Sequence, residues 1–102
     1  MHAVLITFTS SANLAELKGP FTDYAHALRG ISGLVAKTWI RDGSTLGGFY
    51  IFTSQAAAED YLKSEMVASL TANSAFSDFQ IRHFDVLDEF SAMTRSPQAV
   101  RA

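Results

Sequence analysis

The stretch GLVAKTWIRDGSTLGGFYIF, residues 33–52, predicts a β-hairpin that turns at Asp42-Gly43. Its two halves are rich in β-branched and aromatic residues, which favour extended strands. The Asp-Gly dipeptide between them tolerates the positive φ angles that tight hairpin turns require.

The faces of this hairpin follow from its turn, because an even number of loop residues makes opposite residues share a face. One face is then mixed, with Val35, Lys37, Trp39 and Arg41 beside Leu46, Gly48, Tyr50 and Phe52. The other is smooth and aliphatic, with Leu34, Ala36, Thr38 and Ile40 beside Gly47, Phe49, Ile51 and Thr53. Aromatic rings, cationic groups and a glycine that leaves space make the mixed face the main functional clue.

Composition predicts one domain that associates with a second copy of itself. The chain has 102 residues, 48% hydrophobic and only 18% charged, so part of its apolar surface is expected to be buried in a homodimer. A net charge of −2 without a basic stripe argues against nucleic acid as a partner. The absence of cysteine excludes disulfides and thiolate sites and suits a reducing cytoplasm.

The first residues predict a strand. His2–Thr9 is apolar on both alternating faces, as in a central strand, and is too short for a signal peptide or membrane span. Asn13 and Glu16 resemble a capping box that opens a short helical turn, which Gly19-Pro20 should end. Pro20 then begins a helix that stops at Gly30. Its core-facing stripe comprises Phe21, Tyr24, Ala25 and Leu28.

The second half predicts one more helix and one more strand. Ser54 is a candidate N-cap for a helical stripe that continues to about residue 72, with a break near Ser64. Residues 77–87 predict a fourth strand, whose neighbours His83 and Phe84 require two covered faces or a bulge. Residues 91–102 read as a C-terminal tail.

The order of these elements, βαββαβ, predicts an α+β ferredoxin-like domain over residues 1–90. In that fold both helices cover one face of a four-stranded antiparallel sheet. Strands that are apolar on both sides would leave the other face bare, so we expect two sheets to pack together as a dimeric α+β barrel.

The sequence lacks the residue patterns of metal sites, nucleotide-binding sites and hydrolase active sites. His2, His26 and His83 show no metal-ligand spacing, so no metal is expected. The chain has no phosphate-binding glycine loop, and none of its serines sits in a nucleophile elbow. Nucleotide cofactors and hydrolase chemistry are therefore set aside.

The remaining candidates lie on the strands. Lys37, Trp39, Tyr50 and Phe52 share the mixed face and would line a pocket or, alternatively, pack as core or dimer-interface residues. His83 is a candidate general base, because its ordinary pKa is close to neutral; the alternative is an ordinary strand histidine.

Two tyrosines of the helices are further candidates. Tyr24 and Tyr61 lie on the core-facing stripes, where either hydroxyl would reach a cavity between helices and sheet or simply pack.

Several short motifs together carry a family resemblance. They are Gly33-Leu34, Lys37-Thr38-Trp39, Gly47-Gly48-Phe49-Tyr50-Ile51-Phe52-Thr53, Ala58 with Tyr61-Leu62, and Phe84-Asp85-Val86. In this order and spacing, over roughly residues 3–92, the chain resembles the YdhR-type monooxygenase family. Ala36 departs from that family, which tends to have an aromatic residue just before the lysine, and this departure bears on pocket shape.

The resemblance implies a dimeric α+β barrel of the antibiotic-biosynthesis monooxygenase superfamily, which includes oxygenases that act without metal or flavin. It implies no cofactor, and as partners a phenolic or polycyclic aromatic substrate and molecular oxygen. A cofactor-free oxygenase must turn its substrate into an electron-rich anion in a water-poor pocket. On this hypothesis Trp39 positions the substrate, His83 assists deprotonation, and Lys37 or Tyr50 stabilises the oxyanion.

Two other functions stay open at this stage. An isomerase, cyclase or lyase on the same scaffold would use His83 to move protons and ignore oxygen. A non-catalytic binding dimer would use the aromatic face for affinity alone. A pocket lined only by apolar groups, with His83 and Lys37 in solvent, would favour binding without catalysis.

Overall fold

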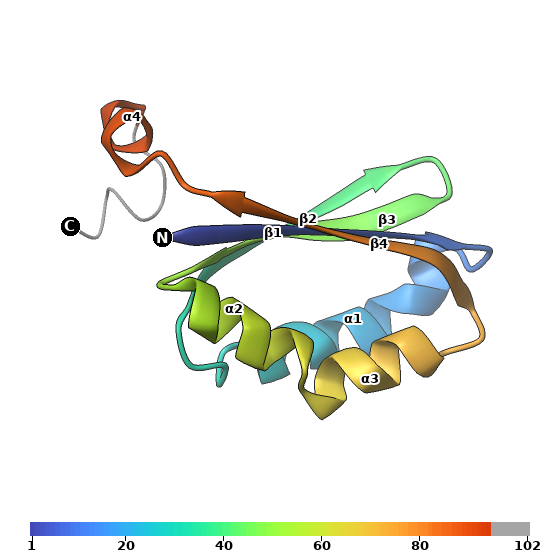
Figure 1. The fold of residues 1–102 in the computed structure, drawn as a ribbon. Helices are drawn as coiled ribbons and strands as arrows, with labels where there is room; N and C mark the ends of the chain where they lie inside the picture. Colours follow the sequence, from blue (N-terminus) through green and yellow to red (C-terminus); the bar gives the residue numbers. More distant parts are fainter. Residues whose placement is uncertain (95–102) are drawn as a thin grey trace.

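The computed structural model, which describes residues 1–94, has one four-stranded antiparallel sheet with three helices on one of its faces (Figure 1). The strand order is β2-β3-β1-β4, which confirms the predicted ferredoxin-like α+β fold. The elements are β1 (His2–Ser10), α1 (Leu14–Leu28), β2 (Leu34–Asp42), β3 (Thr45–Phe52), α2 (Gln55–Leu62), α3 (Glu65–Ala72), β4 (Phe76–Asp85) and α4 (Asp88–Met93).

The β2–β3 hairpin has the predicted register over most of its length. Asp42 pairs with Thr45 across Gly43 and Ser44, and Gly43 has a φ of +60°, a conformation that glycine adopts without strain. The loop is therefore even. The paired residues on the mixed face are Lys37 with Tyr50, Trp39 with Gly48, and Arg41 with Leu46.

The start of β2 corrects that prediction. The register shifts between Leu34 and Ala36, so Leu34 lies opposite Phe52 and packs against the core instead of joining the aliphatic face. A bulge adds one residue to one strand, and it reverses the alternation for every residue before it. A pattern of side-chain types alone does not reveal such an insertion.

Helix α1 was predicted as two pieces, and that prediction was wrong. The Asn13–Glu16 capping box is present, but the helix continues through Pro20 to Leu28. Proline removes one helical hydrogen bond at a cost of about 3 kcal/mol. Buried Leu17 before Pro20 and buried Leu28 after it both pack toward the sheet, and this packing holds the helix together across the proline.

The second half follows the prediction more closely. The Ser54 side chain caps α2, and the expected break falls at Ser64 between α2 and α3. Strand β4 begins one residue earlier and ends two residues sooner than predicted, and its register shift lies beside Asp78, which has a φ of 55°. Helix α4 crosses the predicted start of the tail at residue 91, and residues 95–102 of that tail lie outside the described part.

The core lies between the sheet and α1–α3. Val4 and Phe52 are completely buried, and they pack in one cluster with Leu28, Tyr61 and Val67. The opposite face of the sheet has no helix of this layer, and α4 lies apart from the other three helices (Figure 1). Within residues 1–94, no helix has the length and apolar character needed to cross a membrane.

Candidate functional site

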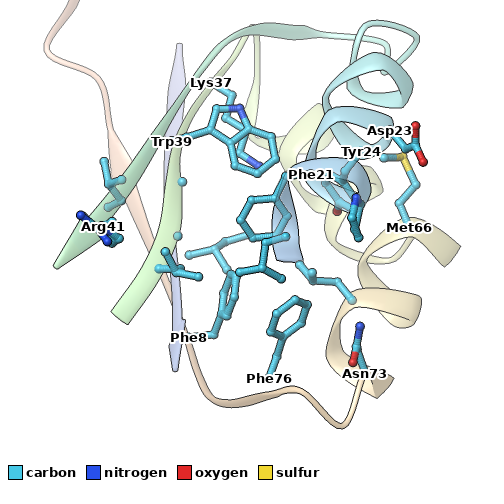
Figure 2. Close-up of a pocket in the computed structure, with 18 of the residues that line it drawn as sticks. Phe8, Phe21, Asp23, Tyr24, Lys37, Trp39, Arg41, Met66, Asn73 and Phe76 are labelled. Carbon is cyan, nitrogen blue, oxygen red and sulfur yellow. The ribbon is translucent and has the colours of Figure 1, made fainter. Parts of the chain in front are cut away.

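A cavity of about 670 Å³ lies between the sheet and helices α1 and α3. Figure 2 shows Lys37 and Trp39 toward one end of it, Phe8 and Phe76 toward the other, and Phe21 between them. Most of its lining is aliphatic or aromatic: Ile6, Phe8, Leu14, Leu17, Phe21, Ala27, Trp39, Leu46, Tyr50, Met66, Leu70 and Phe76 all contribute. The charged and polar part of the lining comes from Asp23, Lys37, Arg41, Ser69 and Asn73. Walls that are mostly apolar favour an organic ligand, and a few polar groups fix its orientation.

Lys37 brings the one amine to this cavity. It stands on β2 opposite Tyr50, and its chain bends over Gly48, where an added Cβ would lie 2.5 Å from Lys37 Cε. Its Nζ lies 3.4 Å from the ring centroid of Trp39, 4.7 Å from that of Tyr50 and 5.1 Å from that of Tyr24. The absent side chain at Gly48 therefore gives the lysine its position among three rings.

The protonation of Lys37 depends on two opposing effects. Burial lowers the pKa of its amine to about 7, because an ammonium loses its hydration there. The faces of the three rings attract the cation and partly offset that loss. No carboxylate lies within 4.0 Å of Nζ in residues 1–94. Both protonation states are thus accessible near neutral pH.

Three tyrosines form a chain of hydroxyl groups beside the lysine. Tyr24 Oη lies 2.5 Å from Tyr61 Oη, and Tyr61 donates to Tyr50 Oη at 3.3 Å. Burial is the main cause that raises the pKa of all three. These phenols stay neutral at physiological pH and act as hydrogen-bond donors.

His83 lies elsewhere on the same side of the sheet. It is opposite Val4 in the register, and its Nδ1 is 2.8 Å from Nε2 of the buried His2. His2 Nδ1 is in turn 3.9 Å from Asp85 Oδ1. His83 does not line the cavity, so the structure does not place it against the aromatic wall. The alternation of side chains along a strand predicts which face of the sheet His83 lies on, but it does not predict how far His83 lies from the hairpin.

The other predicted residues divide into two groups. Lys37, Trp39, Tyr24 and Tyr50 all line the cavity. Tyr61 reaches the site only through its hydroxyl, and Phe52 is fully buried in the core beside it.

Some cavity residues were not singled out as site residues from the sequence. Phe21 lies in the predicted core-facing stripe of its helix, Arg41 lies on the mixed face of the hairpin, and Met66 belongs to α3; all three line the cavity. Phe21 lies 5.0 Å from Trp39 between ring centroids, which continues the aromatic wall from the strand to the helix. For Phe21 and Met66 the helical spacing was the available signal, but this spacing does not separate a core face from a cavity wall.

Comparison with protein families agrees with the resemblance found in the motifs. A family model described as "Putative mono-oxygenase ydhR" matches residues 4–97, which is most of the chain. The chain belongs to the ydhR family. A comparison with curated proteins found no match.

Solved structures similar to this ydhR-family chain share its fold. A structure described as a "putative antibiotic biosynthesis monooxygenase" from Deinococcus radiodurans is 17% identical, with a TM-score of 0.67 over 84% of this chain and 92% of that chain. SnoaB, a cofactor-independent oxygenase from Streptomyces nogalater, is 20% identical, with a TM-score of 0.67 over 83% and 91%. The heme-degrader MhuD from Mycobacterium tuberculosis is 16% identical, with a TM-score of 0.65 over 85% and 96%. At these identities the likeness establishes the fold alone.

Proposed function

We propose that this ydhR-family protein is a cofactor-independent monooxygenase that oxidises a phenolic or polycyclic aromatic molecule in the cavity. The observation that carries the proposal is the Lys37 amine, which lacks a carboxylate partner in residues 1–94 and lies against a mostly apolar, aromatic cavity. Family membership supports oxygenation, and the likeness to SnoaB supports a fold on which such chemistry is done.

In this proposal Lys37 is the general base, in place of His83, which does not line the cavity. An aromatic substrate lies against the rings of Phe21 and Trp39, with its hydroxyl toward Lys37. The neutral amine accepts the phenolic proton, and the resulting ammonium is held by the rings of Trp39, Tyr50 and Tyr24. The Tyr50 hydroxyl donates to the phenolate oxygen and stabilises the anion.

The anion then reacts with oxygen directly. The phenolate gives one electron to triplet oxygen, and the two radicals combine at a ring carbon to form a hydroperoxide. Loss of water from this carbon leaves a carbonyl, so phenol and oxygen give quinone and water. The protein's part is to hold the anion against mostly apolar walls, where a bound substrate displaces water.

The donor set of the cavity does not match a histidine-ligated haem. Among residues 1–94, His2, His26 and His83 all lie outside the lining. Haem proteins commonly hold iron through a proximal histidine, and the tyrosines of this cavity are neutral phenols instead. The chemistry of MhuD is therefore not carried over to this chain.

We also propose that the active form is a cytoplasmic homodimer joined through the open sheet face. That face carries Leu5, Ile40, Phe49 and Ile51, and Ile40 and Phe49 are each 39% exposed. A second sheet packed there would remove these apolar groups from water. The lack of cysteine fits a reducing compartment. Sedimentation should give twice the chain mass, and a stable monomer at micromolar concentration would contradict the dimer.

Oxygen uptake tests the activity. Purified protein is mixed with naphthols and hydroxyanthracenes, with an oxygen electrode and product mass spectrometry as readouts. We expect uptake that rises with pH around a midpoint near 7, as the Lys37 amine becomes neutral.

The control for this experiment is Lys18→Met, an exposed lysine of α1 outside the cavity lining, which should behave as the wild type. Product formation without oxygen uptake would instead identify an isomerase, cyclase or lyase. Tight binding of the phenols without turnover would identify a binding protein.

A further inference from the structure

The Lys37 amine has the surroundings of a nucleophile as well as those of a base. It faces the cavity, it is half-buried among aromatic rings, and no carboxylate of residues 1–94 holds it in an ion pair. We propose that Lys37 forms a Schiff base with hydrophobic aldehydes or ketones that enter the cavity. This activity is separate from oxygenation and needs no oxidant.

The condensation is balanced within the cavity. The amine nitrogen attacks the carbonyl carbon, and the carbonyl electron pair moves to oxygen. The carbinolamine then loses this oxygen as water, which carries away both protons of the former amine, and a carbon–nitrogen double bond forms. One amine and one carbonyl compound give one imine and one water. Burial supports the first step by lowering the pKa of Lys37 to about 7, so that much of the amine is neutral at physiological pH.

The three rings around Nζ stabilise the product. The imine nitrogen takes up one further proton from solvent, and the protonated imine then carries its charge at the position of Nζ, 3.4 Å from the Trp39 centroid and 4.7 Å from that of Tyr50. Cation–π attraction is stronger in such a desolvated site than at a surface. Gly48 keeps the space that the nitrogen needs, because any side chain there would meet the lysine.

The tyrosine chain leaves one proton for the carbonyl oxygen. Tyr61 uses its single hydroxyl proton on Tyr50, so the short contact between Tyr24 and Tyr61 requires Tyr24 to be the donor. The proton of Tyr50 then has no acceptor in residues 1–94, and Tyr50 lines the cavity. Its hydroxyl is placed to donate to a carbonyl that approaches Lys37, which polarises the carbonyl toward attack.

The walls determine which carbonyl compounds fit. Phe8, Phe21 and Phe76 line the space beyond the amine, and a cavity of about 670 Å³ accommodates a bicyclic aromatic or a medium-chain group. Small polar carbonyl compounds would gain little from these walls. We therefore expect aryl and long-chain aldehydes or ketones to be captured in preference to hydroxylated or charged ones.

Reductive trapping tests the proposal. The protein is incubated at pH 7 under argon with 2-naphthaldehyde and cyanoborohydride, and peptide mass mapping quantifies labelling at the N-terminus and at Lys18, Lys37 and Lys63, the three lysines of the chain. We expect Lys37 to be labelled at least about tenfold faster than the two exposed lysines. Glyceraldehyde should not show this preference. Equal labelling of the three lysines, or none at Lys37, would overturn the proposal.

Two variants sharpen the trapping experiment. Tyr50→Phe should slow labelling of Lys37 by about tenfold because the donor to the carbonyl is lost. Unchanged labelling would overturn the role of Tyr50. Lys37→Arg should remove the fast site, while Lys63→Arg should keep it, with circular dichroism confirming that both are folded. Neither phenol nor oxygen is present, so failure here is distinct from failure of the monooxygenase proposal.

Discussion

Two polar clusters lie on the helix-covered side of the sheet, and they differ in what surrounds them. Lys37 lies at a cavity wall among three aromatic rings. The His2–His83 pair lies outside that cavity, and the two imidazole rings hydrogen-bond to each other over 2.8 Å. The difference shows that access to an apolar cavity, more than residue type, decides which group meets a ligand.

Removing each of the two candidate bases in turn tests this comparison most directly. Lys37→Met keeps an unbranched side chain and removes the amine, so kcat for oxygen uptake should fall by about 10²- to 10⁴-fold, the usual share of a general base. His83→Ala should change kcat by less than about threefold, since a group outside the cavity contributes little. Steady-state oxygen uptake measures both. A large loss in His83→Ala with a small one in Lys37→Met would reverse the assignment.

The two clusters should also differ in their contribution to stability. Tyr61→Phe removes the central hydroxyl of the buried chain and should lower the free energy of unfolding by about 1–3 kcal/mol, because it leaves Tyr24 and Tyr50 without their partner. His83→Ala breaks one contact of an exposed side chain, and its cost should be about 1 kcal/mol or less. Urea unfolding measures both variants. Equal losses in the free energy of unfolding would show that the tyrosine chain stabilises the fold no more than the histidine pair does.

Gly48 tests how the amine is positioned. In Gly48→Ala the new methyl group would meet Lys37 Cε and Tyr50 Cε1, so the lysine must move, at a cost of about 1–3 kcal/mol in unfolding free energy. Gly19→Ala is the matched control: nothing lies within 4 Å of its Cβ position, and helix α1 should gain up to about 1 kcal/mol. Quenching of Trp39 fluorescence should change only in the first variant.

The stability of the fold should also depend on pH. The amine of Lys37 has a pKa of about 7 in the folded chain against an ordinary 10.5, so the unfolded chain binds more protons between these values. Stability should therefore rise from pH 7 toward pH 10, and Lys37→Met should flatten this rise. Above about pH 10 it should fall again, because the buried tyrosines keep their protons after the unfolded chain loses them.

Much of this arrangement follows from alternation and turn chemistry. The Asp42-Gly43 turn sets an even loop, and that loop places Lys37, Trp39 and Tyr50 on one face. This face is the helix-covered one that lines the cavity. For these residues the structure therefore favours a place in the pocket wall over a place in a dimer interface. The capping residue Ser54 located the start of α2.

The remaining features depend on three-dimensional packing. The bulge before Ala36 and the continuation of α1 through Pro20 are decided by contacts with the core. The convergence of Tyr24 and Tyr61 on Tyr50 joins three elements that no local pattern relates. For His83, alternation predicts a face but not its distance from Lys37 across the sheet.

The pKa of Lys37 tests the central claim most directly. Selective ¹³C labelling of the lysine ε-carbons allows an NMR pH titration in which Lys37→Arg identifies the signal among the three lysines. The account predicts a midpoint of about 7 for Lys37, because its amine is buried among rings without an anionic partner in residues 1–94. A midpoint near 10.5, the ordinary lysine value, would mean an ammonium in water and would contradict Lys37 as the neutral base and nucleophile of the cavity.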